Sequence, residues 1–166
     1  DIDHHDTTKS ILSGNELLDR VINVEGILVQ SALIDKTLIQ SCTNLQVVSN
    51  VGVGFDNIDA NFCTKMGIQV TNTPGILNDA VADMSMALLL AVARRVPEGD
   101  RIVRSGGFKA NFYHLLWGAD LRGENLGIIG MGSIGQDVAK RAIPFGLNIK
   151  YHNRNRLSKN IESSLN

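Results

Sequence analysis

Short apolar runs alternate with segments of helical periodicity along most of the chain. Apolar residues three and four apart indicate helices, and continuous apolar runs bounded by turn residues indicate buried strands. The predicted order is helix 14–24, strand 26–30, helix 35–41, strand 45–49, helix 60–66, strand 67–71, a long helix capped by Asn78, a helix from Pro97, strand 126–129, helix 136–143 and strand 148–151. Such alternation predicts an α/β fold with a parallel sheet covered by helices on both faces.

A glycine-rich turn stands between the strand at 126–129 and the helix that follows it. Its six residues are Gly130, Met131, Gly132, Ser133, Ile134 and Gly135. In the order strand, G-x-G-x-x-G, helix, Gly130 permits a tight turn, Gly132 lets a pyrophosphate approach the backbone, and Gly135 allows close helix packing. The pattern predicts a dinucleotide-binding turn, and the alternative is an ordinary glycine-rich turn.

The residues after the strand at 148–151 bear on which dinucleotide binds. An Asp or Glu here would bind the ribose 2′-hydroxyl of NAD, but the chain continues with His152, Asn153, Arg154, Asn155 and Arg156. Amide and guanidinium groups suit a 2′-phosphate. This favours NADP(H) over NAD(H), and the alternative is a basic surface loop.

A second glycine-containing loop runs from Val51 to Asp59, at the carboxyl end of a predicted strand. Ligands bind at this end of strands in open α/β sheets, and backbone N–H groups around Gly52 and Gly54 are suited to a small carboxylate. A tight turn in which Asp59 caps the next helix explains the same residues equally well.

Composition excludes several classes of protein. The chain has 166 residues, 43% of them hydrophobic, and a formal net charge of −1, which is ordinary for a globular protein and argues against nucleic-acid or membrane-surface partners. The apolar stretch from Leu77 to Val96 is interrupted by charges, so it predicts a buried helix and not a membrane span. Cys42 and Cys63 lack metal-ligand spacing, which favours packing roles and a reducing, cytoplasmic location.

Histidines and aromatic residues also occur outside these motifs. His4 and His5 stand among three aspartates near the amino terminus, but without a second ligand cluster a solvated terminus is favoured over a metal site. The link 108–122 is rich in aromatic residues, which favours an interface or a covered loop. Within it His114 has no acidic partner nearby in sequence, and a structural role is favoured over a catalytic one.

Three motifs in order resemble those of the D-isomer-specific 2-hydroxyacid dehydrogenases. They are VGVGFDNID from Val51, NTPGILNDAVAD from Asn72, and LRGENLGIIGMGSIGQDVAKRAIPFG from Leu121. The resemblance runs from about Gly26 to Arg156. The HNR ending of the last strand is most similar to NADPH-preferring glyoxylate/hydroxypyruvate and 2-ketogluconate reductases.

This resemblance implies a fold and a set of roles. Residues 1–76 would form part of a flavodoxin-like substrate domain and 77–166 the first βαβ part of a Rossmann NAD(P)-binding domain, with the active site in the cleft between them. The implied site residues are Val51, Gly52 and Val53 for the substrate carboxylate, Val81 beside the nicotinamide, and Asn153 with Arg154 for the 2′-phosphate. The parent enzyme would reduce glyoxylate or hydroxypyruvate with NADPH to D-2-hydroxy acids.

The resemblance also implies what this chain would lack. The family's catalytic Arg, Glu and His lie beyond the second Rossmann strand, so no catalytic residue is assigned here and the isolated chain is expected to be inactive and marginal as a monomer. A strand before Asp1 is expected to be missing as well. The link 108–122 corresponds to a dimerisation arm, with Trp117 near a neighbouring subunit's site. The competing hypothesis is a non-catalytic dinucleotide-binding protein, such as a corepressor or a regulatory isoform.

Overall fold

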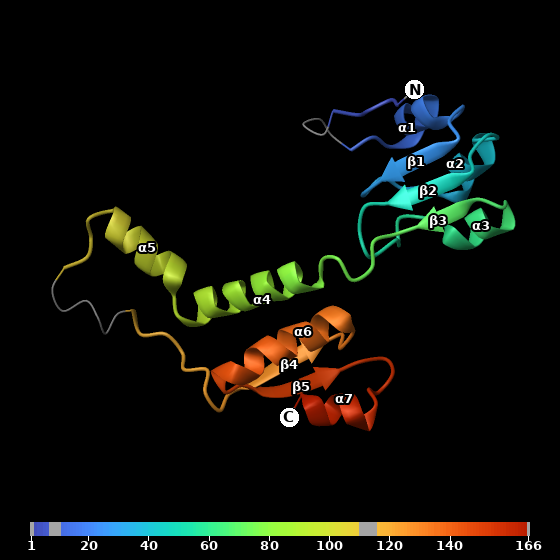
Figure 1. Ribbon diagram of the computed structural model, residues 1–166. Coiled ribbons are helices and arrows are strands. Elements are labelled where there is room, and N and C mark those ends of the chain that lie inside the picture. Colours follow the sequence, from blue (N-terminus) through green and yellow to red (C-terminus); the bar gives the residue numbers. More distant parts are fainter. Residues whose placement is uncertain (1, 7–10, 110–115, 166) are drawn as a thin grey trace. The chain divides into compact units, whose positions relative to one another are not determined.

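The computed structural model describes residues 2–6, 11–109 and 116–165. The chain divides into two compact units, Asp1–Gly75 and Ile76–Asn166. Figure 1 shows the helices and strands of both units. Their bounds are α1 Gly14–Val21, β1 Gly26–Val29, α2 Lys36–Ser41, β2 Val47–Asn50, α3 Ala60–Lys65, β3 Gln69–Thr71, α4 Asn78–Ala93, α5 Val96–Arg104, β4 Asn125–Ile129, α6 Ser133–Ala142, the 3-10 helix η2 Ile143–Phe145, β5 Asn148–His152 and α7 Lys159–Ser164.

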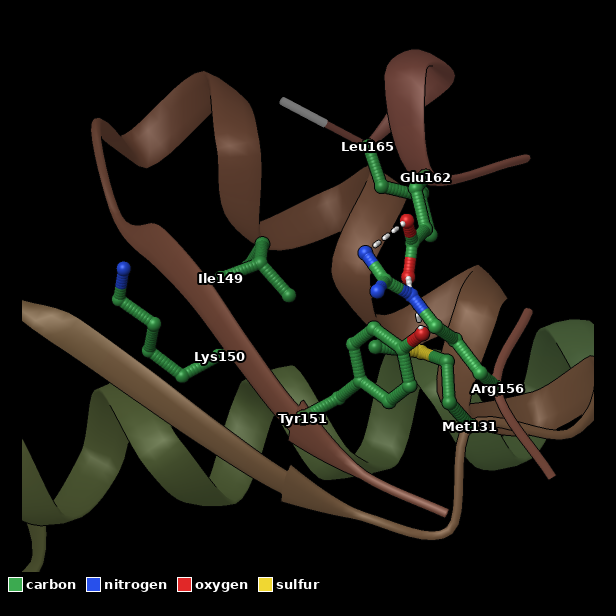
Figure 2. A pocket seen from close by; sticks show the side chains of 7 residues that line it. All are labelled: Met131, Ile149, Lys150, Tyr151, Arg156, Glu162 and Leu165. Atoms are coloured by element: carbon green, nitrogen blue, oxygen red, sulfur yellow. Dashed lines mark hydrogen bonds and ion pairs between the residues drawn. The ribbon is translucent and has the colours of Figure 1, made fainter. Parts of the chain in front are cut away.

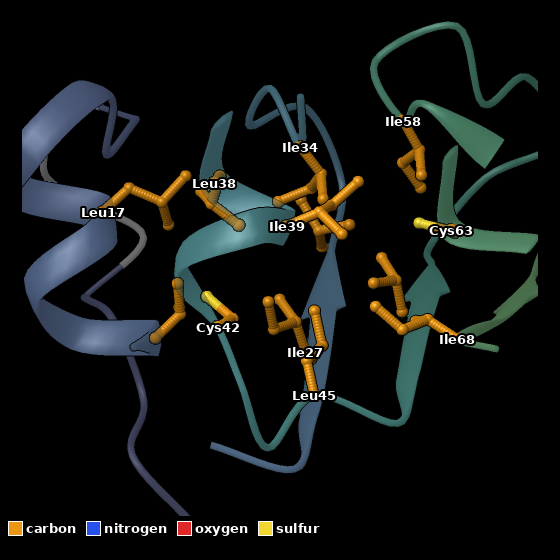
Figure 3. Close-up of a cluster of buried hydrophobic side chains, with 13 residues drawn as sticks. Leu17, Ile27, Ile34, Leu38, Ile39, Cys42, Leu45, Ile58, Cys63 and Ile68 are labelled. Carbon is orange, nitrogen blue, oxygen red and sulfur yellow. The ribbon is translucent and has the colours of Figure 1, made fainter. Parts of the chain in front are cut away.

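The first unit is built on a three-stranded parallel sheet of order β1-β2-β3. Ile27 of β1 stands opposite Val48 of β2, and both lie in a cluster of buried side chains with residues of α1, α2 and α3 (Figure 3). Asp35 and Asp59 begin α2 and α3, where each carboxylate accepts the backbone N–H three residues on. The predicted cap at Asp59 is therefore confirmed.

Among the described residues of this unit, helices cover one face of the sheet. Side chains alternate between faces along a strand, so Ile27 and Val29 point into the core while Leu28 points away and is 73% exposed. The prediction of helices on both faces is wrong for this unit, because α1, α2 and α3 all pack on the face that carries Ile27.

The second unit contains a two-stranded parallel sheet, β4 with β5, joined by α6 and η2. Met86 of α4, Ala142 of α6 and Leu147 form one buried cluster. A second cluster joins Met131 and Ala139 to Leu165, at the end of α7. Helix α7 lies in the polar tail after Asn153, where the apolar pattern predicted no element.

Helix α4 departs from prediction in two respects. Asn78 is its first helical residue, and the capping position belongs to Leu77, so the predicted Asn78 cap is wrong. The stretch Leu77–Val96 was also predicted to be buried, yet within the described residues Met84, Leu88 and Val92 are more than half exposed. Small residues on the opposite side of α4 pack against α6, where Ala82 is fully buried.

The two cysteines lie in the core of the first unit. Cys42 and Cys63 are free and buried, and desolvation raises the pKa of both thiols. The predicted packing role is confirmed.

Candidate functional site

The glycine turn has the backbone geometry that a phosphate-binding turn needs. Gly130 adopts a φ of 96°, a conformation that residues with a Cβ rarely adopt. A Cβ on Gly135 would overlap the carbonyl oxygen of Gly130, so the helix can begin this close to the turn only with glycine there. A Cβ on Gly132 would meet nothing within 4 Å, which leaves open space over the turn.

Helix α6 begins immediately after Gly132, which is its capping residue and has no side chain to satisfy the first N–H groups. The N–H groups of Ser133 and Ile134 find no acceptor among the described residues. Unpaired amides at a helix N-terminus, with open space before them, fit a pyrophosphate. The side chain of Met131 is buried.

One hydrogen bond brings the glycine turn and the basic loop together. The Gly130 N–H donates to the carbonyl of His152 at 2.9 Å, where β4 and β5 end side by side. Asn153 and Arg154 follow directly. Asn153 Nδ2 donates to the Asn155 carbonyl at 3.0 Å, which folds the loop back on itself.

A pocket of about 480 Å³ lies over this loop. Its lining includes the predicted Asn153 and Arg154, and also Arg156, Tyr151 and Glu162. Arg154 makes no hydrogen bond or ion pair with any residue that the structure describes, so its guanidinium is available to a ligand. The structure therefore gathers Gly130, Asn153 and Arg154 at one edge of the sheet.

Glu162 of α7 is a site residue that the sequence did not reveal. Its carboxylate accepts Arg156 Nε at Oε1 and Arg156 Nη2 at Oε2, both at 2.9 Å, and the Tyr151 hydroxyl at 2.5 Å (Figure 2). Arg156 first and Tyr151 second lower the pKa of Glu162 to about 2, so it is ionised at neutral pH. A second pocket of about 310 Å³ adjoins these groups, lined also by Met131, Ile149, Lys150 and Leu165.

The loop after β2 is held by three hydrogen bonds to successive carbonyl groups. The Gly52 carbonyl accepts the Thr73 N–H at 2.9 Å, the Val53 carbonyl accepts Asn72 Nδ2 at 2.8 Å, and the Gly54 carbonyl accepts Asn50 Nδ2 at 2.7 Å. In a planar trans peptide the carbonyl and the next N–H point in opposite directions. Three successive N–H groups, of residues 53, 54 and 55, therefore point away from these anchors.

Those three N–H groups donate to no acceptor in the part of the chain that the structure describes. Gly54 and Phe55 are exposed, and Val53 is half-buried. Val51 differs, because its N–H already donates to the Val29 carbonyl at 2.7 Å. The implied role of the Val51 amide in carboxylate binding is therefore not available, since strand pairing with β1 uses that group.

The remaining sequence-predicted residues are placed as follows. Val81 lies near the start of α4, where its N–H donates to the Leu77 carbonyl and its carbonyl accepts the Ser85 hydroxyl, and it is 39% exposed. Trp117 is 70% exposed. His114 lies outside the described residues. Asp3 and His5 near the amino terminus both contact Arg20 of α1.

None of the helices described is both long enough and apolar enough to cross a membrane. In the part of the chain that the structure describes, no three His, Cys, Asp or Glu side chains are grouped so that they could hold a metal ion.

Parallel sheets, a G-x-G-x-x-G turn of this geometry and a helix that begins directly after its second glycine define a nucleotide-binding α/β protein of the Rossmann type. The particular family follows from sequence comparison. Residues 1–141 match the D-isomer specific 2-hydroxyacid dehydrogenase catalytic domain, and the chain belongs to this family of oxidoreductases. The resemblance inferred from the three motifs is confirmed.

Individual relatives agree with this assignment. A glyoxylate reductase of Pyrococcus horikoshii is 46% identical over 155 residues, covering 90% of this chain and 46% of the relative. A D-isomer specific 2-hydroxyacid dehydrogenase, NAD-binding, from Polaromonas sp. JS6 66 superposes with a TM-score of 0.81 and 38% identity, over 93% of this chain and 49% of that one. A glyoxylate reductase from Paecilomyes thermophila gives a TM-score of 0.78 at 31% identity, over 92% and 49%. The chain thus spans about half the length of these relatives.

Alanine substitutions at two glycines of the turn should differ in their effect on stability. Gly135→Ala places a methyl group on the Gly130 carbonyl oxygen, and overpacking of this kind costs ~1–3 kcal/mol of unfolding free energy. Gly132→Ala meets open space at a φ of −76°, so stability should change by less than ~0.5 kcal/mol. Urea unfolding of both variants measures this. Equal destabilisation by the two would contradict the turn geometry.

Proposed function

We propose that this chain forms the cofactor- and substrate-binding part of an NADPH-preferring reductase of small 2-keto acids, such as glyoxylate and hydroxypyruvate, that yields D-2-hydroxy acids. The observation that carries the proposal is the hydrogen bond from Gly130 to His152, which sets the phosphate-binding turn beside the Arg154 loop. Relatives named as glyoxylate reductases support the substrate class. A cytoplasmic location is part of the same proposal.

Different residues at the end of the second sheet bind different groups of the cofactor. The amides at the start of α6 receive the pyrophosphate, while Arg154 and Asn153 receive the 2′-phosphate. Val81 is assigned to the nicotinamide side. When bound, the nicotinamide supplies the hydride for the keto carbon. We assign no residue of this chain to the proton-donating role, so the chain alone is expected to bind the cofactor without turnover.

Cofactor preference is testable on the 166-residue chain by calorimetric titration. NADPH should bind more tightly than NADH. Arg154→Asp should lower the affinity for NADPH at least about tenfold, because it removes a charge-assisted hydrogen bond and adds repulsion between the new carboxylate and the 2′-phosphate. NADH affinity should change little in the variant. If NADPH preference survived the charge reversal, the 2′-phosphate assignment would be wrong.

Dinucleotide binding alone would fit a non-catalytic sensor equally well. Reduction of glyoxylate by the whole protein distinguishes the two functions, because a sensor would bind NADPH and leave the keto acid unchanged. Absence of turnover in the whole protein, with cofactor binding intact, would favour the sensor.

We propose that the loop after β2 receives the substrate carboxylate through the N–H groups of Val53, Gly54 and Phe55. The support is the capture of the three preceding carbonyls by Thr73, Asn72 and Asn50, which turns these amides outward. Successive outward N–H groups form a concave anion site. The Gly52 carbonyl anchors the loop by accepting the Thr73 N–H.

Amide chemical shifts can test this assignment. Titrating ¹⁵N-labelled chain with oxalate, a dianion that mimics the 2-keto acid, should move the resonances of residues 53 to 55. The Val51 amide should stay in place, since it is bonded to Val29, and it serves as an internal control. Movement of Val51 without the other three would contradict the proposed direction of the loop.

We propose further that two copies of the chain associate through α4 and the link 108–122. Leu77, Met84, Leu88 and Val92 recur at helical spacing on α4 and are exposed, as is Trp117 in the described part of the link. Apolar stripes of this kind mark interfaces. Leu88→Lys should lower the mass in solution from that of a dimer to that of a monomer, because it places a charge in the proposed apolar interface. Light scattering measures the mass, and the surface control Lys65→Gln should leave it unchanged. A monomeric parent would contradict the proposal.

A further inference from the structure

The two arginines beside the proposed 2′-phosphate position are in different electrostatic states. Arg154 and Arg156 line the same pocket. Arg156 gives two of its donors to Glu162, one to each carboxylate oxygen at 2.9 Å. Arg154 forms no hydrogen bond or ion pair with the residues described. The two guanidinium groups therefore differ: in the described part of the chain, the charge of Arg156, which is 81% exposed, is paired with a carboxylate, and the charge of Arg154 is not.

Glu162 is itself part of the pocket wall and is well restrained. Its side chain is 19% exposed, and the Tyr151 hydroxyl holds one carboxylate oxygen at 2.5 Å. Tyr151 in turn accepts the backbone N–H of Leu157 at 3.2 Å, so the carboxylate is tied to both ends of the basic loop. An ionised carboxylate fixed in this way cancels the charge of Arg156 and repels a phosphate nearby.

We propose that Glu162 limits the selectivity of this pocket for a 2′-phosphate by claiming Arg156 as its counter-ion, which leaves recognition to Arg154. The proposal rests on the NADP(H) preference proposed above. Glu162 does not contact the phosphate; it acts through Arg156 and is a positioning residue. Arg156 has the role of neutralising Glu162 and is not a phosphate ligand.

The test compares two probes that differ by the phosphate in question, adenosine 2′,5′-bisphosphate and adenosine 5′-monophosphate. Their dissociation constants for the 166-residue chain are measured by calorimetry at low salt, and their ratio defines selectivity. The variants are Glu162→Gln, Arg156→Gln, the double variant carrying both changes, and Arg154→Gln. Glutamine is nearly isosteric with glutamate, and in place of arginine it is a shorter polar side chain; in both cases it removes the charge.

Selectivity should rise about threefold in Glu162→Gln, because Arg156 is released and a like charge is removed. It should fall by about the same factor in Arg156→Gln, which leaves the carboxylate uncompensated. The double variant should return to within about twofold of the parent, because both charges are gone. In Arg154→Gln the selectivity for the 2′-phosphate should fall about tenfold. Affinity for the 5′-monophosphate should stay constant throughout.

A double variant as unselective as Arg156→Gln would overturn the proposal, because Arg156 would then be a direct ligand. A Glu162→Gln variant that lost affinity for both probes equally would also overturn it, since that is the result of a purely structural role. A parent with no preference for the 2′-phosphate would refute the NADP(H) assignment. Even then, a gain of selectivity in Glu162→Gln would support the pairing of Arg156 with Glu162. Failure of the NADP(H) assignment can therefore be told apart from failure of the role proposed for Glu162.

Discussion

The candidate cofactor site depends on the close approach of two backbone segments at the end of β4. The carbonyl of Gly130 lies where any Cβ on Gly135 would be, and the N–H of the same residue is bonded to His152. Neither contact involves a side chain. Because parallel strands bring their carboxyl ends to one edge, this pairing also brings the residues after β5 to the turn. The basic loop, the pocket above it and its counter-ions are positioned as a result.

Charge near that edge is balanced by the short helix α7, which the hydrophobic pattern of the sequence did not predict. Helix α7 has six residues and depends on Leu165, which packs with Met131 and Ala139. Its placement brings Glu162 to Arg156 and divides the basic loop into one neutralised and one available arginine. In the sequence alone, Arg154 and Arg156 are equivalent positive charges. The chemistry of the pocket depends on which of them has a partner.

The first unit shows how carbonyl groups can determine the direction of amides. Asn50 is almost completely buried, and it uses its amide nitrogen to hold the Gly54 carbonyl. The Asn72 side chain and the Thr73 backbone N–H hold the two preceding carbonyls in the same way. The N–H groups that follow these carbonyls therefore point outward. Sheet faces and helix stripes elsewhere remain apolar and exposed, as at Leu28 and Leu88. Surfaces of that kind are usually covered in a working assembly.

The sequence by itself determined the alternating fold, the glycine turn and the family, because hydrophobic period and glycine spacing are local signals. It located β4 and β5 to within one residue at each end and the end of α6 equally well, although α6 begins three residues before the predicted start, and it indicated the Asp59 cap. Only the tertiary structure decided that the Val51 amide is used by β1, that Asn78 lies inside its helix, and that Glu162 occupies Arg156. Each of these depends on a partner distant along the chain or on the exact start of an element. Hydrogen-bond partners that folding brings together from distant positions produce no periodic pattern in the sequence.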